Sequence, residues 1–455
     1  MSSSSFGNLL EALPTEGGGS GVTETASTIA AADLFPDIRQ QGAAGGANAK
    51  FAHERVVLSA VEEVLESQGL QPTAISYMGG LMMSLQTPTT QPSLLGAALV
   101  LLERALAGVP PHLLCSKRAR IAEVLVSVSN ENSDQAAVLR PALLCVKRLL
   151  IARPNGATST AAAKRGNVPG DVLKLFRWVI QFVRHQNPKV RQRGQAVCIE
   201  LLHSEALPVG WLSPAVARFA EQKLGAITLS EAQSALHLLH FLRGALPELL
   251  PEDASALVAA MLKLPQLGHP LLSKSALELL TAAAAGHGGG APLPPKALIQ
   301  IQNALLGFLS DVEQAGGGGL KARARRDAAL VPSAARAAVA AAVALCTQRA
   351  IEGERQLAAL VGALLRALNR QALAGVETAA AAAERAGMKP SEPLGADDLL
   401  ELLNGCATSK LSAQTATAIA EVFALPPPPY PRTPFSSPLP PTHYSLSFTP
   451  ISVSS

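Results

Sequence analysis

Residues 171–202, DVLKLFRWVIQFVRHQNPKVRQRGQAVCIELL, carry the pattern that decides the fold class. In the first half, apolar residues fill one side of a helix of 3.6-residue period, and cations occupy the opposite arc. The second half opens with Asn187 and Pro188, which suit the cap and the first position of a new helix, and an apolar i, i+3, i+4 stripe follows. The stretch therefore predicts two helices joined by a short turn.

This helix pair recurs along the chain. Two series of helix starts are visible, one at Asp171, Ser213 and Glu252, the other at Asn187–Pro188, Ser230 and His269–Pro270. Spacings of about 40 residues are typical of HEAT and armadillo arrays, whose repeats bury their apolar faces only against neighbouring repeats. The sequence thus predicts an all-α fold, a curved α-solenoid of HEAT- or armadillo-like repeats.

The pattern extends in both directions. Upstream we expect helices at 53–67, 73–86, 93–107, 112–129 and 134–152, the last of them kinked at Pro141. Downstream we expect helices at 295–314, 331–350, 353–370 and 372–387, with loops at 153–170, 286–294 and 315–327. Residues 1–50 are rich in Ser, Gly and Ala, and residues 425–455 in Pro and Ser, so we expect both ends to be disordered around a repeat array at 51–424.

Composition narrows the function classes. Apolar residues make up 48% of the 455 residues and aromatic residues only 4%, which favours helices over strands. The five cysteines are far apart, and neither a secretory signal nor a charge-free apolar run of membrane-spanning length is visible, so we expect a soluble intracellular protein without a membrane partner. Phosphate-binding loops and nucleophile elbows are missing too. The pair His237 and His240 is interpreted as part of a packing helix. We therefore expect no enzyme, cofactor, metal or small-molecule substrate.

Charge is distributed unevenly. Residues 135–199 contain twelve basic residues and one acid, a net charge of +11, whereas the whole chain carries only +4. Such a stretch favours binding of a polyanion through its phosphates, and we take six of its residues as candidate RNA contacts: Lys174, Arg177, Arg184, Lys189, Arg191 and Arg193. Two alternatives stay open: the cations form an ordinary solvated face, or Arg191 and Arg193 pair with groups of the next repeat.

A second basic run, KARARR at 321–326, is expected in a Gly-rich loop. Its cations Lys321, Arg323, Arg325 and Arg326 are candidates for a nuclear-localisation element or an RNA-binding arm, although short runs of this kind also arise by chance.

Several segments, in order, resemble the ribosomal RNA-processing protein 12 family. They are FAHERVVLSAVEEVLESQG (51–69), SYMGGLMMSLQ (76–86), residues 172–202, and the run from LSEAQSALHLLHFL to SKSALELL (229–280). The resemblance covers about residues 51–285 and is looser over 286–424. Members of that family have many more repeats, so we expect this chain to match their N-terminal part, as a truncated or misspliced product would.

The resemblance implies a non-catalytic nucleolar HEAT-repeat protein of the nucleus. Its expected partners are pre-ribosomal RNA and pre-ribosomal proteins, and its expected role is in rRNA processing, subunit maturation and nuclear export with a Ran-type GTPase. The alternative is a karyopherin-like transport receptor or adaptor that binds such a GTPase and cargo. Both are α-solenoids, so fold does not separate them. The cationic stretch favours the first, because karyopherins usually present acidic inner surfaces.

Overall fold

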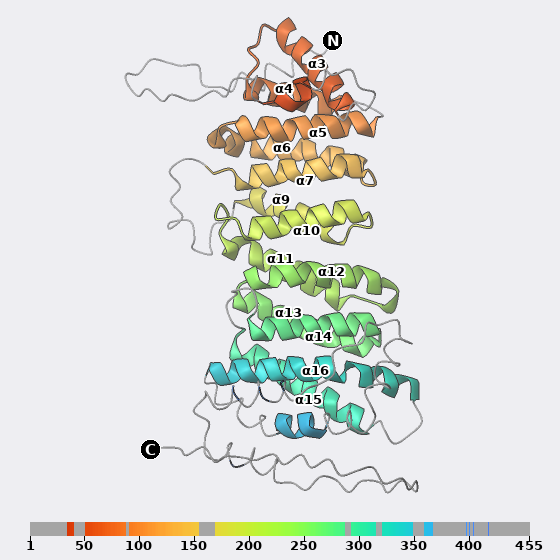
Figure 1. Cartoon of the computed structure of the whole chain (residues 1–455). Helices are drawn as coiled ribbons and strands as arrows, with labels where there is room; N and C mark the ends of the chain where they lie inside the picture. Colours follow the sequence, from red (N-terminus) through yellow and green to blue (C-terminus); the bar gives the residue numbers. More distant parts are fainter. Residues whose placement is uncertain are drawn as a thin grey trace, which may run out of the picture.

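The computed structural model describes residues 34–40, 51–87, 91–153, 169–286, 293–314, 321–348 and 359–366, together with the single positions 397, 400, 404 and 417. Within these ranges every regular element is an α-helix or a 3₁₀ turn, so the prediction of an all-α repeat fold is confirmed. The helices stack one above another into an elongated ladder, from α3 at one end to α15 and α16 towards the other (Figure 1).

The ladder has two layers, because each helix packs on the next helix but one. The α9 layer consists of α4 (Ala74–Gln86), α6 (Pro111–Glu131), α9 (Gly170–Gln181), α11 (Val209–Gly225), α13 (Pro251–Lys263) and α15 (Pro295–Gln314). The α10 layer consists of α5 (Pro92–Gly108), α7 (Ala136–Ile151), α10 (Pro188–Leu202), α12 (Ala232–Ala245), α14 (Pro270–Ala285) and α16 (Lys321–Thr347). Helix α3 (Ala52–Ser67) packs on α4 and α5 at the end of the ladder.

Several helices begin at the capping residues that the sequence predicts. Asn187 caps α10, since its Oδ1 accepts a hydrogen bond from the Lys189 amide at 3.0 Å. His269 caps α14 in the same way, its Nδ1 accepting from the Leu272 amide at 3.3 Å. A proline then takes the first helical position, where its missing N–H is no loss. The predicted starts at 187–188 and 269–270 are therefore confirmed.

Two predicted boundaries are wrong. Helix α11 begins at Val209 rather than at Ser213. Ser213 is fully buried, and its hydroxyl donates to Asp253 at 2.6 Å and accepts from the Leu250 amide at 2.9 Å. It therefore caps the next repeat instead of its own helix. The first of the two helices predicted within 171–202 ends at Gln181, and a 3₁₀ turn, η2 (Phe182–Arg184), tightens the chain before α10.

The predicted disordered lead-in at 1–50 is wrong for residues 34–40. Helix α2 (Pro36–Gln40) lies against α3, with Phe35 and Ile38 fully buried. The Phe35 ring meets Tyr77 edge-on at 5.1 Å between centroids, and Arg39 pairs with Glu62 of α3. These long-range contacts stabilise a segment whose local composition does not favour helix. The rest of 1–50 lies outside the described residues.

The loop predicted at 315–327 is wrong for residues 321–327. Helix α16 begins at Lys321, so the run 321–326 is helical rather than part of a Gly-rich loop. Alanine and arginine are both good helix formers, which suits a helix over this run despite the glycines that precede it in the sequence. Of the helix predicted at 353–370, residues 359–366 are described and helical. The tail 425–455, the helix at 372–387 and most of the loop at 153–170 lie outside the described residues.

One apolar core runs through the described part of the ladder, from Phe35 to Leu364. Each repeat adds leucine, valine and alanine side chains to it, and each fully buried Leu or Val contributes about 1.5–3 kcal/mol relative to an exposed one. None of the helices in the described ranges has the length and apolar character needed to cross a bilayer.

Candidate nucleic-acid interface

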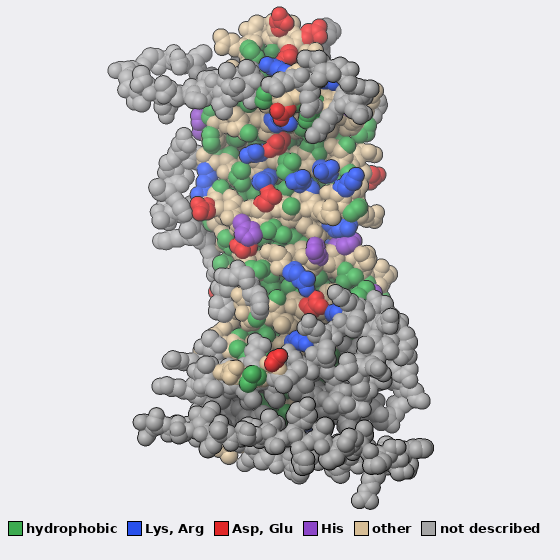
Figure 2. Space-filling model, viewed as in Figure 1, with side chains coloured by type: hydrophobic (Ala, Val, Ile, Leu, Met, Phe, Trp, Pro, Cys, Tyr) green, Lys and Arg blue, Asp and Glu red, His purple; other side chains and the backbone are tan. Residues whose placement is uncertain are grey.

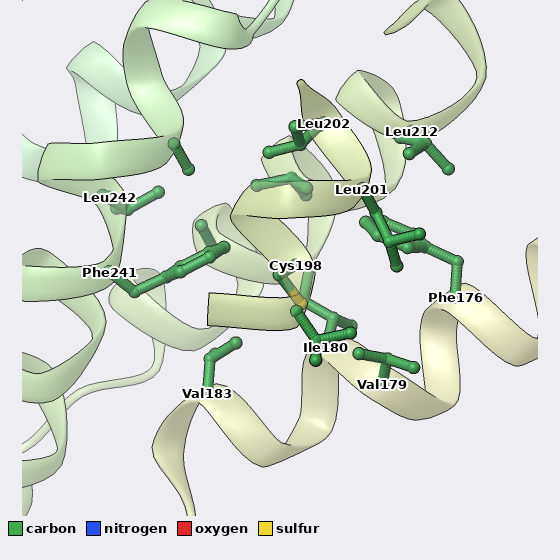
Figure 3. Packing of buried hydrophobic residues seen from close by; sticks show 14 of the residues in the cluster. Phe176, Val179, Ile180, Val183, Cys198, Leu201, Leu202, Leu212, Phe241 and Leu242 are labelled. Carbon is green, nitrogen blue, oxygen red and sulfur yellow. The ribbon is translucent and has the colours of Figure 1, made fainter. Parts of the chain in front are cut away.

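Helix α9 is amphipathic, and this places Lys174 and Arg177 on the surface. Phe176, Val179 and Ile180 are buried, and Figure 3 shows them packed towards Cys198 and Leu201 of α10. The opposite side of α9 carries Lys174 and Arg177, both exposed. Neither side chain makes an ion pair with any residue that the structure describes. Two candidate RNA contacts are thus free to meet a phosphate.

Arg184 and Arg191 are engaged in holding the turn between α9 and α10. The Arg184 Nε donates to the Ser234 hydroxyl of α12 at 2.8 Å. The Arg191 Nη1 atom donates to two backbone carbonyls, that of His185 at 3.0 Å and that of Gln186 at 3.2 Å. Both side chains are half-buried. Arg191 therefore binds carbonyls, as the structural alternative anticipated, but those of its own turn and not of the next repeat.

Lys189 and Arg193 lie on α10, within its first two turns. Lys189 is exposed and Arg193 is half-buried, and neither forms an ion pair among the described residues. No carboxylate among the described residues therefore pairs with Arg193 in the way that the second open alternative had anticipated.

The six candidates do not form one continuous stripe. Lys174 and Arg177 are exposed from the α9 layer, whereas Lys189 and Arg193 belong to the α10 layer. The turn holding Arg184 and Arg191 lies between these two groups in the chain. The structure thus separates four of the candidates into two clusters on different layers. The α9 cluster contains Lys174 and Arg177, and the α10 cluster contains Lys189 and Arg193.

The cations of α9 gain two exposed neighbours outside the six candidates, and those of α10 gain one. Arg120 in the middle of α6 and Arg218 in the middle of α11 are exposed, and these helices flank α9 in its layer. On the α10 layer, Lys147 of α7 pairs with Glu200 of α10. Arg140 lies two turns before Lys147 on α7, and Arg193 lies two turns before Glu200 on α10. The exposed Arg140 therefore has the same position along α7 as Arg193 has along α10. Sequence periodicity within one helix did not reveal these neighbours; the offset between stacked helices does.

Acids from neighbouring repeats neutralise part of the +11 stretch. Glu103, which precedes the stretch, accepts from the Arg148 Nε at 2.8 Å, and Glu200, which follows it, pairs with Lys147. Arg153 donates to the Ala206 carbonyl. Figure 2 shows Lys and Arg side chains gathered in the upper half of the view, at the level of α7 in Figure 1, with Asp and Glu side chains among them. The net charge of the sequence segment therefore overstates the cationic character of this face.

The histidines of α12 lie beside the α10 cluster. His237 Nε2 is 3.1 Å from the Gln233 amide nitrogen, and its backbone carbonyl accepts from Gln195. Partial burial, followed by the positive charges of Arg191 and His240, lowers the pKa of His237 below its ordinary value. Among the residues that the structure places, no three His, Cys, Asp or Glu side chains are grouped closely enough to hold a metal ion.

The candidate nuclear-localisation residues Lys321, Arg323, Arg325 and Arg326 lie in the first two turns of α16. Their side chains are outside the described part of the structure, so their use as a localisation signal stays a prediction.

Comparisons of the sequence with known proteins point to one family. A family model described as RRP12-like, N-terminal HEAT repeats, matches residues 47–287. An RRP12-like protein of Gallus gallus is 27% identical over 273 residues, and one of Homo sapiens is 27% identical over 270 residues. Each alignment covers 57% of this chain and 20% of the relative, so the chain spans about a fifth of the length of the curated relatives it matches.

A search of solved structures finds a crystal structure of an engineered protein. It shares 15% identity with a TM-score of 0.31, covering 86% of this chain and 92% of that one. A likeness at that level supports no conclusion about function.

Proposed function

The chain belongs to the RRP12-like family through its N-terminal HEAT repeats, and from this premise we propose that it is a non-catalytic scaffold of ribosome biogenesis. In this role it binds pre-ribosomal RNA and pre-ribosomal proteins in the nucleus and nucleolus. It thereby supports rRNA processing, subunit maturation and nuclear export.

The proposal of RNA binding rests on the exposed cations of the α9 layer, which form no ion pair with any described residue. Lys174 and Arg177 stand between Arg120 on one side and Arg218 on the other, over three consecutive helices of one layer. None of these four side chains pairs with a carboxylate of the described residues. Cations that are not neutralised internally release counterions when a phosphate replaces solvent, which is the main source of sequence-independent affinity for RNA.

The two-layer architecture supports a scaffold that holds more than one partner. A single core runs along the ladder between the two layers, so their outer surfaces lie on opposite sides of it. The α9 layer offers unpaired cations, whereas the α10 layer presents a mixture of ion pairs and free cations. An RNA on the first surface and a protein on the second would not compete for the same residues.

The test compares two charge-reversal variants of the full chain. Lys174→Glu/Arg177→Glu/Arg218→Glu removes the α9 cluster, and Arg140→Glu/Lys189→Glu/Arg193→Glu removes the α10 cluster. All six side chains are exposed or half-buried and outside the core, so the fold should survive, which circular dichroism checks. We expect the first variant to lose most affinity for pre-ribosomal RNA and the second to lose less. Unchanged RNA affinity in both folded variants would contradict RNA binding through these surfaces.

Two further measurements address the biological role. The tagged chain should sediment with pre-ribosomal particles and accumulate in the nucleolus, and the first variant should do so less. The karyopherin-like alternative predicts instead that a GTP-loaded Ran-type GTPase binds the chain directly while RNA does not.

A further inference from the structure

Helices α6 and α9 run in the same direction at a fixed register. Arg118 in the first half of α6 donates to Asp171 at the start of α9 at 3.2 Å. Beyond the other ends of the two helices, His185 Nε2 lies 3.1 Å from the Ser133 carbonyl oxygen. The first contact joins residues 53 apart and the second joins residues 52 apart. Because this offset stays nearly constant, equivalent positions on the two helices lie side by side.

This register places Arg120 of α6 at nearly the same height as Lys174 of α9. Both side chains are exposed, as are Arg177 one turn further along α9 and Arg218 in the middle of α11. We call these four cations the α9 row. Packed helix axes are about 8–10 Å apart, so the row spans about 16–20 Å across three neighbouring helices. The core beneath these helices fixes the spacing of their backbones.

Carboxylates border the α9 row on one side. Glu123 and Glu221 are exposed one turn after Arg120 and Arg218, and neither pairs with a cation of the described residues. A phosphate displaced by one turn from the cations therefore meets negative charge. The row is thus narrow, and it suits a single line of phosphates that runs along the ladder.

The aromatic rings of these three helices are turned away from the α9 row. Helix α6 has no Phe, Tyr or Trp in its sequence, and Phe176 and Trp178 of α9 are buried. On α11, Trp211 and Phe219 are half-buried, and the Lys223 amine stands over the Phe219 ring, 6.0 Å from its centroid. Unpaired bases gain affinity by stacking on exposed rings. The row therefore offers such bases charge but no stacking surface.

The energetic balance differs between unpaired and base-paired RNA. An unpaired strand is flexible, so holding its phosphates at the spacing of fixed cations costs conformational entropy that stacking normally offsets. The exposed imidazole of His112 lies two turns before Arg120 on α6, about 12 Å along the helix axis, and so stands off the row. A duplex already orders its phosphates, and proteins recognise it chiefly through phosphates and 2′-hydroxyls.

We propose that the α9 row binds the phosphate backbone of base-paired RNA in preference to unpaired RNA. This inference rests on the proposed RNA-binding function and specifies its substrate class. One strand of the duplex follows the row from Arg120 through Lys174 and Arg177 to Arg218, while its bases stay paired and are not read. The contact is therefore indifferent to sequence and depends on the strand being part of a double helix.

The experiment titrates the full chain into two labelled RNAs at one salt concentration and measures fluorescence anisotropy. One is a duplex of about 20 base pairs, long enough to cover the row, and the other is unpaired oligouridine with the same number of phosphates. Oligolysine, which has charge without fixed geometry, measures the preference that charge density alone produces. We expect the chain to bind the duplex about tenfold more tightly than oligouridine, and oligolysine to show a smaller ratio.

The outcomes separate this inference from the function on which it rests. Oligouridine binding as tight as duplex binding, or a ratio no larger than that of oligolysine, would overturn the preference and leave RNA binding intact. Failure of the chain to bind either RNA would refute the proposed function as well.

Matched variants locate the preference. Lys174→Glu/Arg177→Glu/Arg218→Glu should abolish most of the duplex preference, whereas Arg140→Glu/Lys189→Glu/Arg193→Glu on the other layer should retain it. An unchanged ratio in the first variant, with circular dichroism showing an intact fold, would place the preference elsewhere and contradict the proposal.

A gain of function tests the role of stacking. Gln222 is exposed one turn after Arg218 on α11, so Gln222→Trp adds a ring beside the row. This change should raise the affinity for oligouridine about fivefold and leave duplex binding unchanged. Gln222→Leu, which adds an apolar group without a ring, is the control and should change neither affinity. Oligouridine affinity that is the same in Gln222→Trp and Gln222→Leu would show that a missing stacking surface does not set the preference.

Discussion

Gly96 of α5 lies directly against the backbone carbonyl of Ala137 in α7. An ideal Cβ on Gly96 would stand 2.6 Å from that oxygen. Ala137 is four residues before Pro141, which has no N–H, so this carbonyl lacks its usual partner within the helix. The proline inside α7 and the glycine of α5 are therefore two parts of one contact between neighbouring repeats.

Replacing Gly96 with alanine should destabilise the protein by about 1–3 kcal/mol, because the added methyl group meets backbone that cannot rotate away. The free energy of unfolding in urea measures the effect. Gly307→Ala is the matched control: it lies within α15, is exposed, and has open space around it. That change should stabilise the helix by about 0.5–1 kcal/mol, and equal losses in both variants would refute the explanation.

Among the cations of the described residues, Arg118 should lower the free energy of unfolding most when it is removed. It is 7% exposed and donates to the Leu149 and Ala152 carbonyls at the end of α7 and to Asp171 of α9 at 3.2 Å. Arg118→Ala leaves these acceptors buried or half-buried without a donor, and should cost about 3 kcal/mol. Hydrogen exchange should show the loss at the junction of α6, α7 and α9.

Arg120→Ala, two residues further along α6, provides the comparison. Arg120 is exposed, so its removal should change the stability by less than about 0.5 kcal/mol. Similar exchange rates at the junction in both variants would show that Arg118 does not hold the three helices together.

Tyr77 should make stability depend on alkaline pH. Burial, reinforced by its hydrogen bond to Glu62, raises the pKa of Tyr77 to about 12 from an unfolded value of 10.0. The folded state thus favours the protonated phenol, and the associated stability is complete below pH about 10 and is lost as pH rises towards about 12. Ultraviolet titration of tyrosinate should show one late component, which Tyr77→Phe removes. A late component that persists in Tyr77→Phe would assign it to another tyrosine.

RNA binding should weaken steeply with salt. For single strands, the logarithm of affinity falls with the logarithm of salt concentration by about 0.7 for each phosphate contacted. Lys174→Glu/Arg177→Glu/Arg218→Glu should therefore reduce this slope by roughly 2 when affinity is measured between about 50 and 200 mM salt. A lower affinity with an unchanged slope would indicate a change of fold rather than lost phosphate contacts.

The fold was largely predictable from local patterns. The cap–proline pairs at 187–188 and 269–270 start helices because their chemistry acts within one turn. Helix α2 was not predictable in this way, because its anchors Phe35 and Arg39 act through Tyr77 and Glu62, far along the chain. The start of α11 was missed for the same reason, since Ser213 binds Asp253 of the next repeat.

The candidate interface was predictable only in part. Helical periodicity correctly places Lys174 and Arg177 on the solvent side of α9. It says nothing of the layer to which a helix belongs, so it did not separate the candidates on α9 from those on α10. Nor does it reveal that Ser234 and the carbonyl of His185 occupy Arg184 and Arg191.

The spacing of the α10 layer has a mechanical consequence. Gly96 leaves no room for a Cβ against the backbone of α7, and Gly244 brings α12 close to Ile199 of α10. The pairs Glu103–Arg148, Lys147–Glu200 and Arg243–Glu278 connect α5 with α7, α7 with α10, and α12 with α14. We therefore expect the spacing of helices in the α10 layer to change less than the spacing in the α9 layer when the ladder bends. Flexing of the ladder is then taken up on the other side. It would stretch or compress the distances from Arg120 through Lys174 and Arg177 to Arg218, so the curvature of the array sets the spacing of its free cations.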